Sequence, residues 1–146
     1  MRAIGLDLGS RRIGVALCDR EGTVATPYET VHRSGDPERD HAELIRLADD
    51  AEAEVVVVGL PISLDGTHGT AAEAARAEAA ELAAAIGVPV VLHDERLTTV
   101  SAERSLRSQG LRGTRARKVV DQVAASVILQ DWLDGGGPGR VTRERL

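Results

Sequence analysis

Three acidic residues stand where a carboxylate needs a compensating partner. Asp7 lies inside the apolar run 4–9, Glu95 ends the run 88–95, and Asp121 falls in a segment with helical spacing. A carboxylate that leaves water costs several kcal/mol unless cations or hydrogen-bond donors compensate it. If the fold brings the three together, they would support binding of a divalent metal ion through oxygen ligands.

Each of these carboxylates also has a simpler interpretation. Asp7 could cap a local turn, and Glu95 could form a surface ion pair with Arg96, a kind of contact that contributes little to stability. Asp121 could cap the helix that begins near it. The residues alone leave these alternatives open.

A basic stretch lies between Glu95 and Asp121. From residue 96 to residue 118 seven cationic side chains accompany a single acid, although the whole chain has a formal net charge of −5. Such a run by itself could be a solvated surface. Its place between two candidate site carboxylates favours a rim that binds phosphates. The cationic residues are Arg96, Arg104, Arg107, Arg112, Arg115, Arg117 and Lys118.

Composition limits the classes of function. The 146 residues, 42% of them hydrophobic, suit a single domain. No apolar run reaches the ~20 residues that span a bilayer, and no signal-peptide pattern opens the chain, so we expect a cytoplasmic protein without membrane contact. With one Trp, one Tyr and no Phe, stacking on bases cannot be a major binding mode. The single cysteine, Cys18, is expected to be a buried thiol, and the histidines show no zinc pattern.

Strand and helix patterns alternate along the chain. The expected strands are short apolar runs at 4–8, 13–18, 23–31, 55–60 and 88–92. The expected helices have capping residues or alanine-rich and amphipathic patterns, and cover 37–51, 70–86, 98–109 and 118–133. Residues 9–12 form a hairpin turn, and Asp36 is the N-cap of the first helix.

This order of elements describes an α/β fold with a mixed five-stranded sheet and helices on both faces. Such sheets place their sites at the carboxyl ends of central strands, where Glu95 lies. Asp121 shares a helical stripe with Ala124, Ala125 and Ile128, so it is expected to face the sheet. Residues 1–134 are predicted to form one domain, and residues 135–146 a disordered tail with too little apolar content to pack.

Four motifs, in this order, resemble the YqgF family. They are 4–16 (IGLDLGSRRIGVA), 58–61 with 65–67 (VGLP, DGT), 94–99 (DERLTT), and 120–125 with 128–130 (VDQVAA, ILQ). The resemblance covers about residues 1–134. Family members are described as pre-16S rRNA nucleases and as RuvX-type Holliday-junction resolvases. The resemblance therefore implies an RNase H-like fold and a metal-dependent nuclease that acts on structured nucleic acid in the cytoplasm.

The resemblance also implies roles for individual residues. Asp7, Glu95 and Asp121 would be the catalytic carboxylates and would hold two Mg²⁺ or Mn²⁺ ions. In most RNase H-like nucleases the second acid follows the fourth strand, but the strand 55–60 ends without an acid. The resemblance therefore places the second acid after the neighbouring strand, where Asp94 is the alternative to Glu95 as the metal ligand. Asp65 would lie in a turn that could approach the substrate. The nucleic-acid-binding candidates are Arg11, Arg12, Arg96, Arg112, Arg115, Arg117 and Lys118.

Two other classes of function remain as alternatives. The segment 7–15 also resembles the first phosphate loop of the actin, Hsp70 and sugar-kinase group, but those enzymes close two domains on a nucleotide and this chain has room for one. A non-catalytic nucleic-acid-binding or transcription-associated module could keep the same fold, although the retention of all three acids counts against it. The sequence leaves the choice between RNA and DNA open, and symmetric cleavage of a DNA junction would favour a homodimer.

Overall fold

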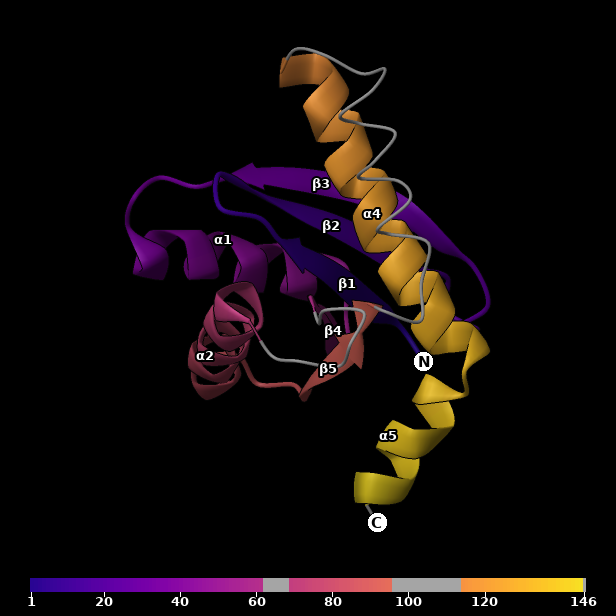
Figure 1. Ribbon diagram of the computed structural model, residues 1–146. Helices are drawn as coiled ribbons and strands as arrows, with labels where there is room; N and C mark the ends of the chain where they lie inside the picture. Colours follow the sequence, from indigo (N-terminus) through magenta and orange to yellow (C-terminus); the bar gives the residue numbers. More distant parts are fainter. Residues whose placement is uncertain (62–68, 96–113, 146) are drawn as a thin grey trace.

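Five strands form one mixed sheet in the order β3-β2-β1-β4-β5 (Figure 1). The structure is a computed structural model, and it describes residues 1–61, 69–95 and 114–145. β1 pairs with β2, and β2 with β3, in antiparallel directions, whereas β1–β4 and β4–β5 are parallel. The strands are β1 (Ala3–Leu8), β2 (Arg12–Cys18), β3 (Ala25–His32), β4 (Val55–Leu60) and β5 (Val90–Asp94).

The described helices cover both faces of this sheet, with α4 on one side and α1 and α2 on the other (Figure 1). They are α1 (Pro37–Asp50), α2 (Thr70–Ala85), α4 (Thr114–Asp134) and α5 (Gly137–Arg145). The fold class predicted from the sequence is therefore confirmed. None of the described helices is long and apolar enough to cross a bilayer.

Strand alternation creates two separate apolar cores. Successive side chains of a strand point to opposite faces, so Val56 and Val58 pack toward α1 and α2, whereas Val55 and Val57 pack toward α4. All six residues of β4 are buried, as the continuous apolar run predicted. The predicted buried thiol of Cys18 is also confirmed.

A glycine on β1 lets α4 approach the sheet closely. A Cβ atom at Gly5 would lie 2.8 Å from Cβ of Leu129 and 3.1 Å from the carbonyl oxygen of Ala125. Any larger residue there would push the helix outward. The distance between α4 and the middle of β1 therefore depends on this glycine.

Most predicted element boundaries agree with the structure to within a few residues. Asp36 caps α1, its side chain accepting from the Glu38 amide at 3.1 Å, and Pro37 opens the helix. β5 begins at Val90, two residues later than predicted, because Pro89 has no amide hydrogen for the sheet. The predicted helix 98–109 and the turn at Asp65 lie outside the described residues.

The prediction of a disordered tail after residue 134 is wrong for residues 137–145, which form α5. The chain turns at Gly136, whose φ of +80° favours glycine, and Val141 becomes buried in the same core as Trp132. The prediction failed because it counted the apolar residues of the tail alone. It did not include the large apolar surface that Trp132 offers.

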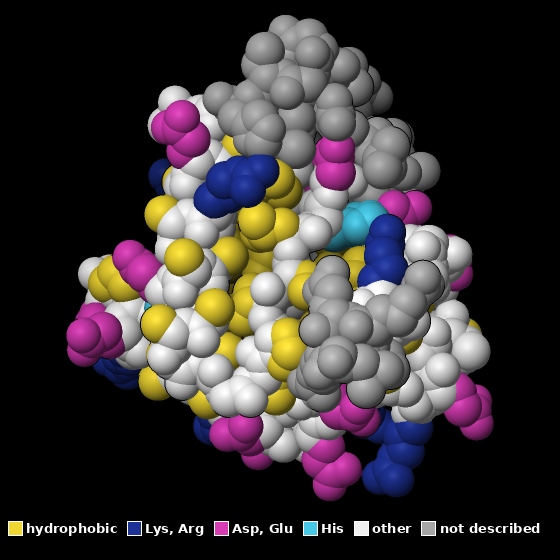
Figure 2. Space-filling view, turned by 90° about the horizontal axis from the view of Figure 1, so that it is seen from below, with side chains coloured by type: hydrophobic (Ala, Val, Ile, Leu, Met, Phe, Trp, Pro, Cys, Tyr) yellow, Lys and Arg dark blue, Asp and Glu magenta, His cyan; other side chains and the backbone are white. Residues whose placement is uncertain are grey.

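The face formed by α2, β5 and α5 carries hydrophobic side chains in its middle and charged side chains of both signs around them (Figure 2). The run 88–92, expected from the sequence to be a central strand, forms β5 at the edge of the sheet, because no further described strand pairs beyond it, and Leu92 on it is 39% exposed. Unpaired strand edges are where proteins can associate, so this edge depends on its short length and on neighbouring side chains for protection.

We predict that Gly137→Val detaches α5 from the core. A Cβ at Gly137 would lie 2.2 Å from Cε2 of Trp132, so the larger side chain must displace the indole or the helix. Overpacking of this kind costs about 1–3 kcal/mol of unfolding free energy. Urea unfolding should show the loss, and the emission of the only tryptophan should shift to longer wavelength. Arg140→Gln, an exposed change on the same helix, is the control, and unchanged emission in Gly137→Val would contradict the packing described.

Candidate active site

Asp7 and Glu95 reach the same edge of the sheet from two different strands. Leu6 pairs with Val58 and Leu60 pairs with Asp94, so the parallel strands β1, β4 and β5 end at about the same level. This convergence is the expected location of a site in an open α/β sheet. The two acids therefore come from strand ends separated by β4.

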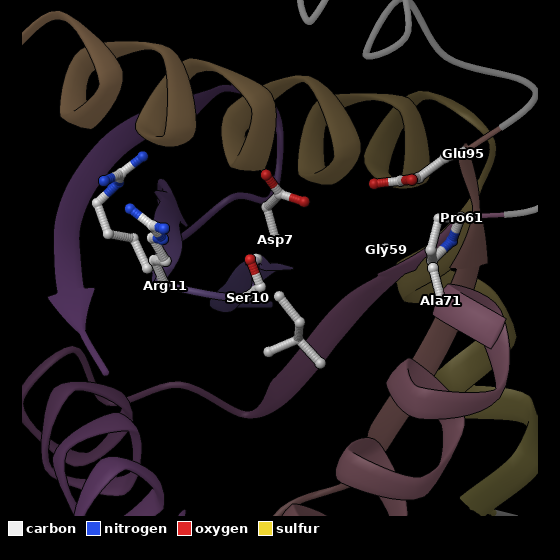
Figure 3. A pocket seen from close by; sticks show the side chains of 10 residues that line it. Asp7, Ser10, Arg11, Gly59, Pro61, Ala71 and Glu95 are labelled. Atoms are coloured by element: carbon white, nitrogen blue, oxygen red, sulfur yellow. The ribbon is translucent and has the colours of Figure 1, made fainter. Parts of the chain in front are cut away.

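A pocket of about 330 Å³ contains both carboxylates. Asp7 is 5% exposed and Glu95 is 4% exposed. Figure 3 shows the Glu95 carboxylate pointing across the pocket toward Asp7, with Arg11 on the far side of Asp7. The lining residues are Asp7, Leu8, Gly9, Ser10, Arg11, Arg12, Gly59, Pro61, Ala71 and Glu95.

Gly59 on β4 makes room for the Glu95 carboxylate. A Cβ at Gly59 would lie 3.0 Å from Oε1 of Glu95 and 2.5 Å from Cδ1 of Ile128 on α4. A side chain on β4 would therefore collide with both neighbours. β4 has no acid at its end, but its glycine, Gly59, leaves the space through which Glu95 reaches the pocket from the end of β5.

His93 fixes β5 against α4 two residues before Glu95. Its Nε2 lies 2.6 Å from Oδ2 of Asp131 on α4. Alternation along the strand places His93 and Glu95 on the same side of the backbone. The pair thus holds the end of β5 at the level where Glu95 enters the pocket.

The turn between β1 and β2 forms the wall beside Asp7. The Gly9 amide donates to the carbonyl oxygens of Arg12 at 3.0 Å and Asp7 at 3.1 Å. A Cβ at Gly9 would lie 2.5 Å from the Arg12 carbonyl oxygen, so only glycine fits this turn. The turn presents Ser10 and Arg11, both exposed, at the opening of the pocket.

The structure brings together four of the predicted site residues, namely Asp7, Glu95, Arg11 and Arg12. Asp94, the rival of Glu95, lines a different pocket, next to Trp132 and Arg140. The remaining predicted side chains lie outside the described residues: Arg96 and Arg112 in the segment 96–113, and Asp121, Arg115, Arg117 and Lys118 on α4.

Sequence reasoning missed the part of the wall formed by Pro61 and Ala71. Pro61 directly follows β4, and Ala71 lies in the first turn of α2. The signal was available for Pro61, because the residue after a central strand lies at the carboxyl edge of the sheet. Nothing local pointed to Ala71, since its place depends on how α2 packs.

The donor set of the pocket fits a divalent cation. Asp7 and Glu95 offer carboxylate oxygens, which are the ligands that Mg²⁺ and Mn²⁺ prefer. Two carboxylates that face one space repel each other when both are charged, and a bound cation would offset that repulsion. Among the described side chains no group of three His, Cys, Asp or Glu forms. Asp121, whose side chain lies outside the described residues, is the third ligand predicted from the sequence.

Solved structures identify the class of fold. RuvC of T. thermophilus in complex with a Holliday junction substrate aligns with a TM-score of 0.58 and 19% identity, over 94% of this chain and 96% of that one. A second RuvC structure, from Thermus thermophilus, aligns with a TM-score of 0.56 and 15% identity, over 97% and 98%. The chain therefore has the RNase H-like fold of RuvC.

Sequence comparison identifies the family within this class. The family model described as "RuvX: Holliday junction resolvase" matches residues 1–135, so the chain belongs to the RuvX family. Two relatives are named "Putative pre-16S rRNA nuclease". The one from Mycobacterium sp. (strain KMS) is 52% identical, and the alignment covers 91% of this chain and 79% of the relative. The one from Myxococcus xanthus (strain DK1622) is 47% identical, and the alignment covers 94% of this chain and 91% of the relative. The family predicted from the four motifs is confirmed.

We predict that Glu95→Gln abolishes cleavage at saturating Mg²⁺, whereas Asp94→Asn retains most of it. Only Glu95 shares the pocket with Asp7, so only its replacement removes a ligand charge from that space. The loss should exceed the roughly 10- to 100-fold that changes outside the ligand shell cost. Initial rates on a labelled substrate give the ranking. The reverse ranking would assign the ligand role to Asp94, and equal tolerance of both changes would favour a binding module.

Proposed function

We propose that this chain is a metal-dependent nuclease that hydrolyses phosphodiester bonds in structured nucleic acid. The observation that carries the proposal is the single pocket that holds two buried carboxylates from different strands beside an arginine-bearing turn. Acidic oxygens suit a divalent cation, and arginine suits a phosphate, so the two walls fit the two charged parts of such a reaction.

In the proposed reaction the acidic residues of the pocket would bind metal ions and Arg11 would bind the substrate. Asp7, Glu95 and, as a prediction, Asp121 would hold Mg²⁺ or Mn²⁺. When bound, such ions activate a water molecule and stabilise charge on the leaving oxygen of a phosphodiester. Arg11 would bind a phosphate next to the cleaved bond, because its exposed guanidinium lies at the pocket opening. The turn that carries Arg11 would keep that phosphate in register with the acids.

The proposed substrate is the 5′ end of precursor 16S rRNA. The relatives that share about half of their residues with this chain carry names that refer to that RNA. A four-way DNA junction is the second candidate, because the family model carries the name of a junction resolvase. Junction cleavage would call for a homodimer, since two symmetric cuts need two sites. Action on precursor rRNA would place the protein in the cytoplasm.

We expect Asp7→Asn to lose metal-dependent cleavage of both substrates while keeping the fold. The change removes one of the mutually repelling buried charges, so thermal stability without metal should hold or rise slightly. Calorimetric titration with Mn²⁺ should show weaker binding than in the wild type. Full nuclease activity in this variant would refute the assignment of Asp7. Metal binding in the wild type without cleavage of either substrate would favour the non-catalytic module.

We expect Arg11→Gln to weaken nucleic-acid binding and to flatten its salt dependence. One lost phosphate contact should change the slope of log K against log salt concentration by roughly 0.7 to 0.9. Arg20→Gln is the matched control, because Arg20 is also exposed but lies beyond the end of β2, next to Glu52 rather than the pocket. Fluorescence anisotropy at several salt concentrations gives the slopes. Equal slopes for Arg11→Gln and the wild type would show that Arg11 is only solvated.

A further inference from the structure

A guanidinium directly after β3 holds the turn that carries Ser10 and Arg11. Nε of Arg33 donates to the Gly9 carbonyl oxygen at 2.7 Å. The backbone amide of Arg33 donates to the Arg11 carbonyl oxygen at 2.9 Å. One residue therefore contacts the turn on both sides of Ser10.

The other end of the same guanidinium is fixed by two helices. Nη1 and Nη2 of Arg33 each donate to a carboxylate oxygen of Glu78 on α2, both at 2.8 Å. Oε2 of Glu78 also lies 2.8 Å from Nε2 of His41 on α1. The side chains of Arg33, Glu78 and His41 are 22%, 17% and 8% exposed, so solvent screens these contacts only in part. The turn is thus connected through Arg33 to both helices on that face.

The charges within this cluster reinforce each other. Burial alone would raise the pKa of Glu78, but the hydrogen bonds from Arg33 and His41 outweigh it and lower that pKa. The hydrogen bond to Glu78 in turn raises the pKa of Arg33. A charged, two-pronged contact between arginine and carboxylate is among the stronger and more directional hydrogen-bonded pairs in proteins.

The turn needs such support because it buries no side chain of its own. Ser10 and Arg11 are exposed, and Gly9 has no side chain. Ser10 and Arg11 line the pocket with Asp7 on one side and, with Arg33, a second hollow of about 510 Å³ on the other. The turn lies between two open spaces. Its position therefore depends on hydrogen bonds to its backbone carbonyl oxygens rather than on apolar packing.

We propose that Arg33 is a positioning residue of the nuclease site, which holds the Gly9–Arg11 turn so that Arg11 stays in register with Asp7. The catalytic part of this inference rests on the proposed function. Arginine is required because its planar fork reaches the Gly9 carbonyl and both Glu78 oxygens at once. A lysine ammonium is a single point charge and cannot satisfy the three acceptors in this geometry.

The test compares Arg33→Lys and Glu78→Gln with two controls. Arg46→Gln removes another arginine that binds carboxylates, but on the exposed face of α1 beside Glu43 and Asp50. Leu47→Val is a core change on α1 that lowers stability without touching the turn. Rates are measured on fully folded protein at saturating metal and substrate, and amide hydrogen exchange is measured at Gly9.

We expect Arg33→Lys to lower kcat by about 10- to 100-fold, the range seen when a supporting contact is lost, with a much smaller change in KM. Glu78→Gln should cause a smaller loss in the same direction. The Gly9 amide, which donates to the Arg12 carbonyl oxygen, should exchange about tenfold faster in Arg33→Lys. Both controls should keep the kcat of the wild type and slow exchange at Gly9.

Two results would overturn the inference. One is unchanged Gly9 exchange in Arg33→Lys, and the other is a loss of kcat no larger than in Leu47→Val. If the wild type cleaves nothing, the proposed function fails, but the exchange experiment still tests the hold on the turn. If Arg33→Lys does not fold, the same exchange and kcat criteria apply to Glu78→Gln, which leaves Arg33 in place but weakens the ion pair that fixes the far end of its guanidinium.

Discussion

The close approach of α4 to the sheet is the constraint on which the site depends. It occurs above two glycines, Gly5 on β1 and Gly59 on β4, where an added Cβ would come within 2.8 Å of Leu129 and 2.5 Å of Ile128 respectively. Packed interiors do not absorb such overlaps without moving an element. The same closeness sets the depth of the pocket, because α4 covers the face on which Asp7 and Glu95 lie.

The two faces of the sheet treat buried charge in different ways. On the face of α1 and α2, Glu78 is matched by Arg33 and His41, so its charge stabilises the fold. On the face of α4, two acids, Asp7 and Glu95, line one pocket, and like charges that face the same space repel each other. Proteins depart from such matching mainly at functional sites, where a bound ligand can offset the repulsion between like charges. This contrast is the physical reason to look for a cation at one cluster and not at the other.

Much of the fold followed from the sequence because local patterns determined it. The bounds of β4 were predicted correctly from six apolar residues, and Asp36 with Pro37 marked the start of α1. Helix α5 was missed because its burial depends on Trp132, a contact that no pattern within the tail encodes. The contacts of Glu78 with Arg33 and His41 were missed for a similar reason, since they join residues 45 and 37 positions apart.

The position of the second acid depends on the pairing register of β4 and β5 as well as on the sequence motif 94–99. The sequence placed Asp94 and Glu95 together at the end of one strand and could not choose between them. In the structure Leu60 pairs with Asp94, so Glu95 extends one residue beyond the pairing, on the side of His93 and α4. Gly59 leaves the space that its carboxylate occupies. The glycine near the end of β4 and the acid just after β5 therefore belong together, because a side chain at Gly59 would crowd the carboxylate of Glu95.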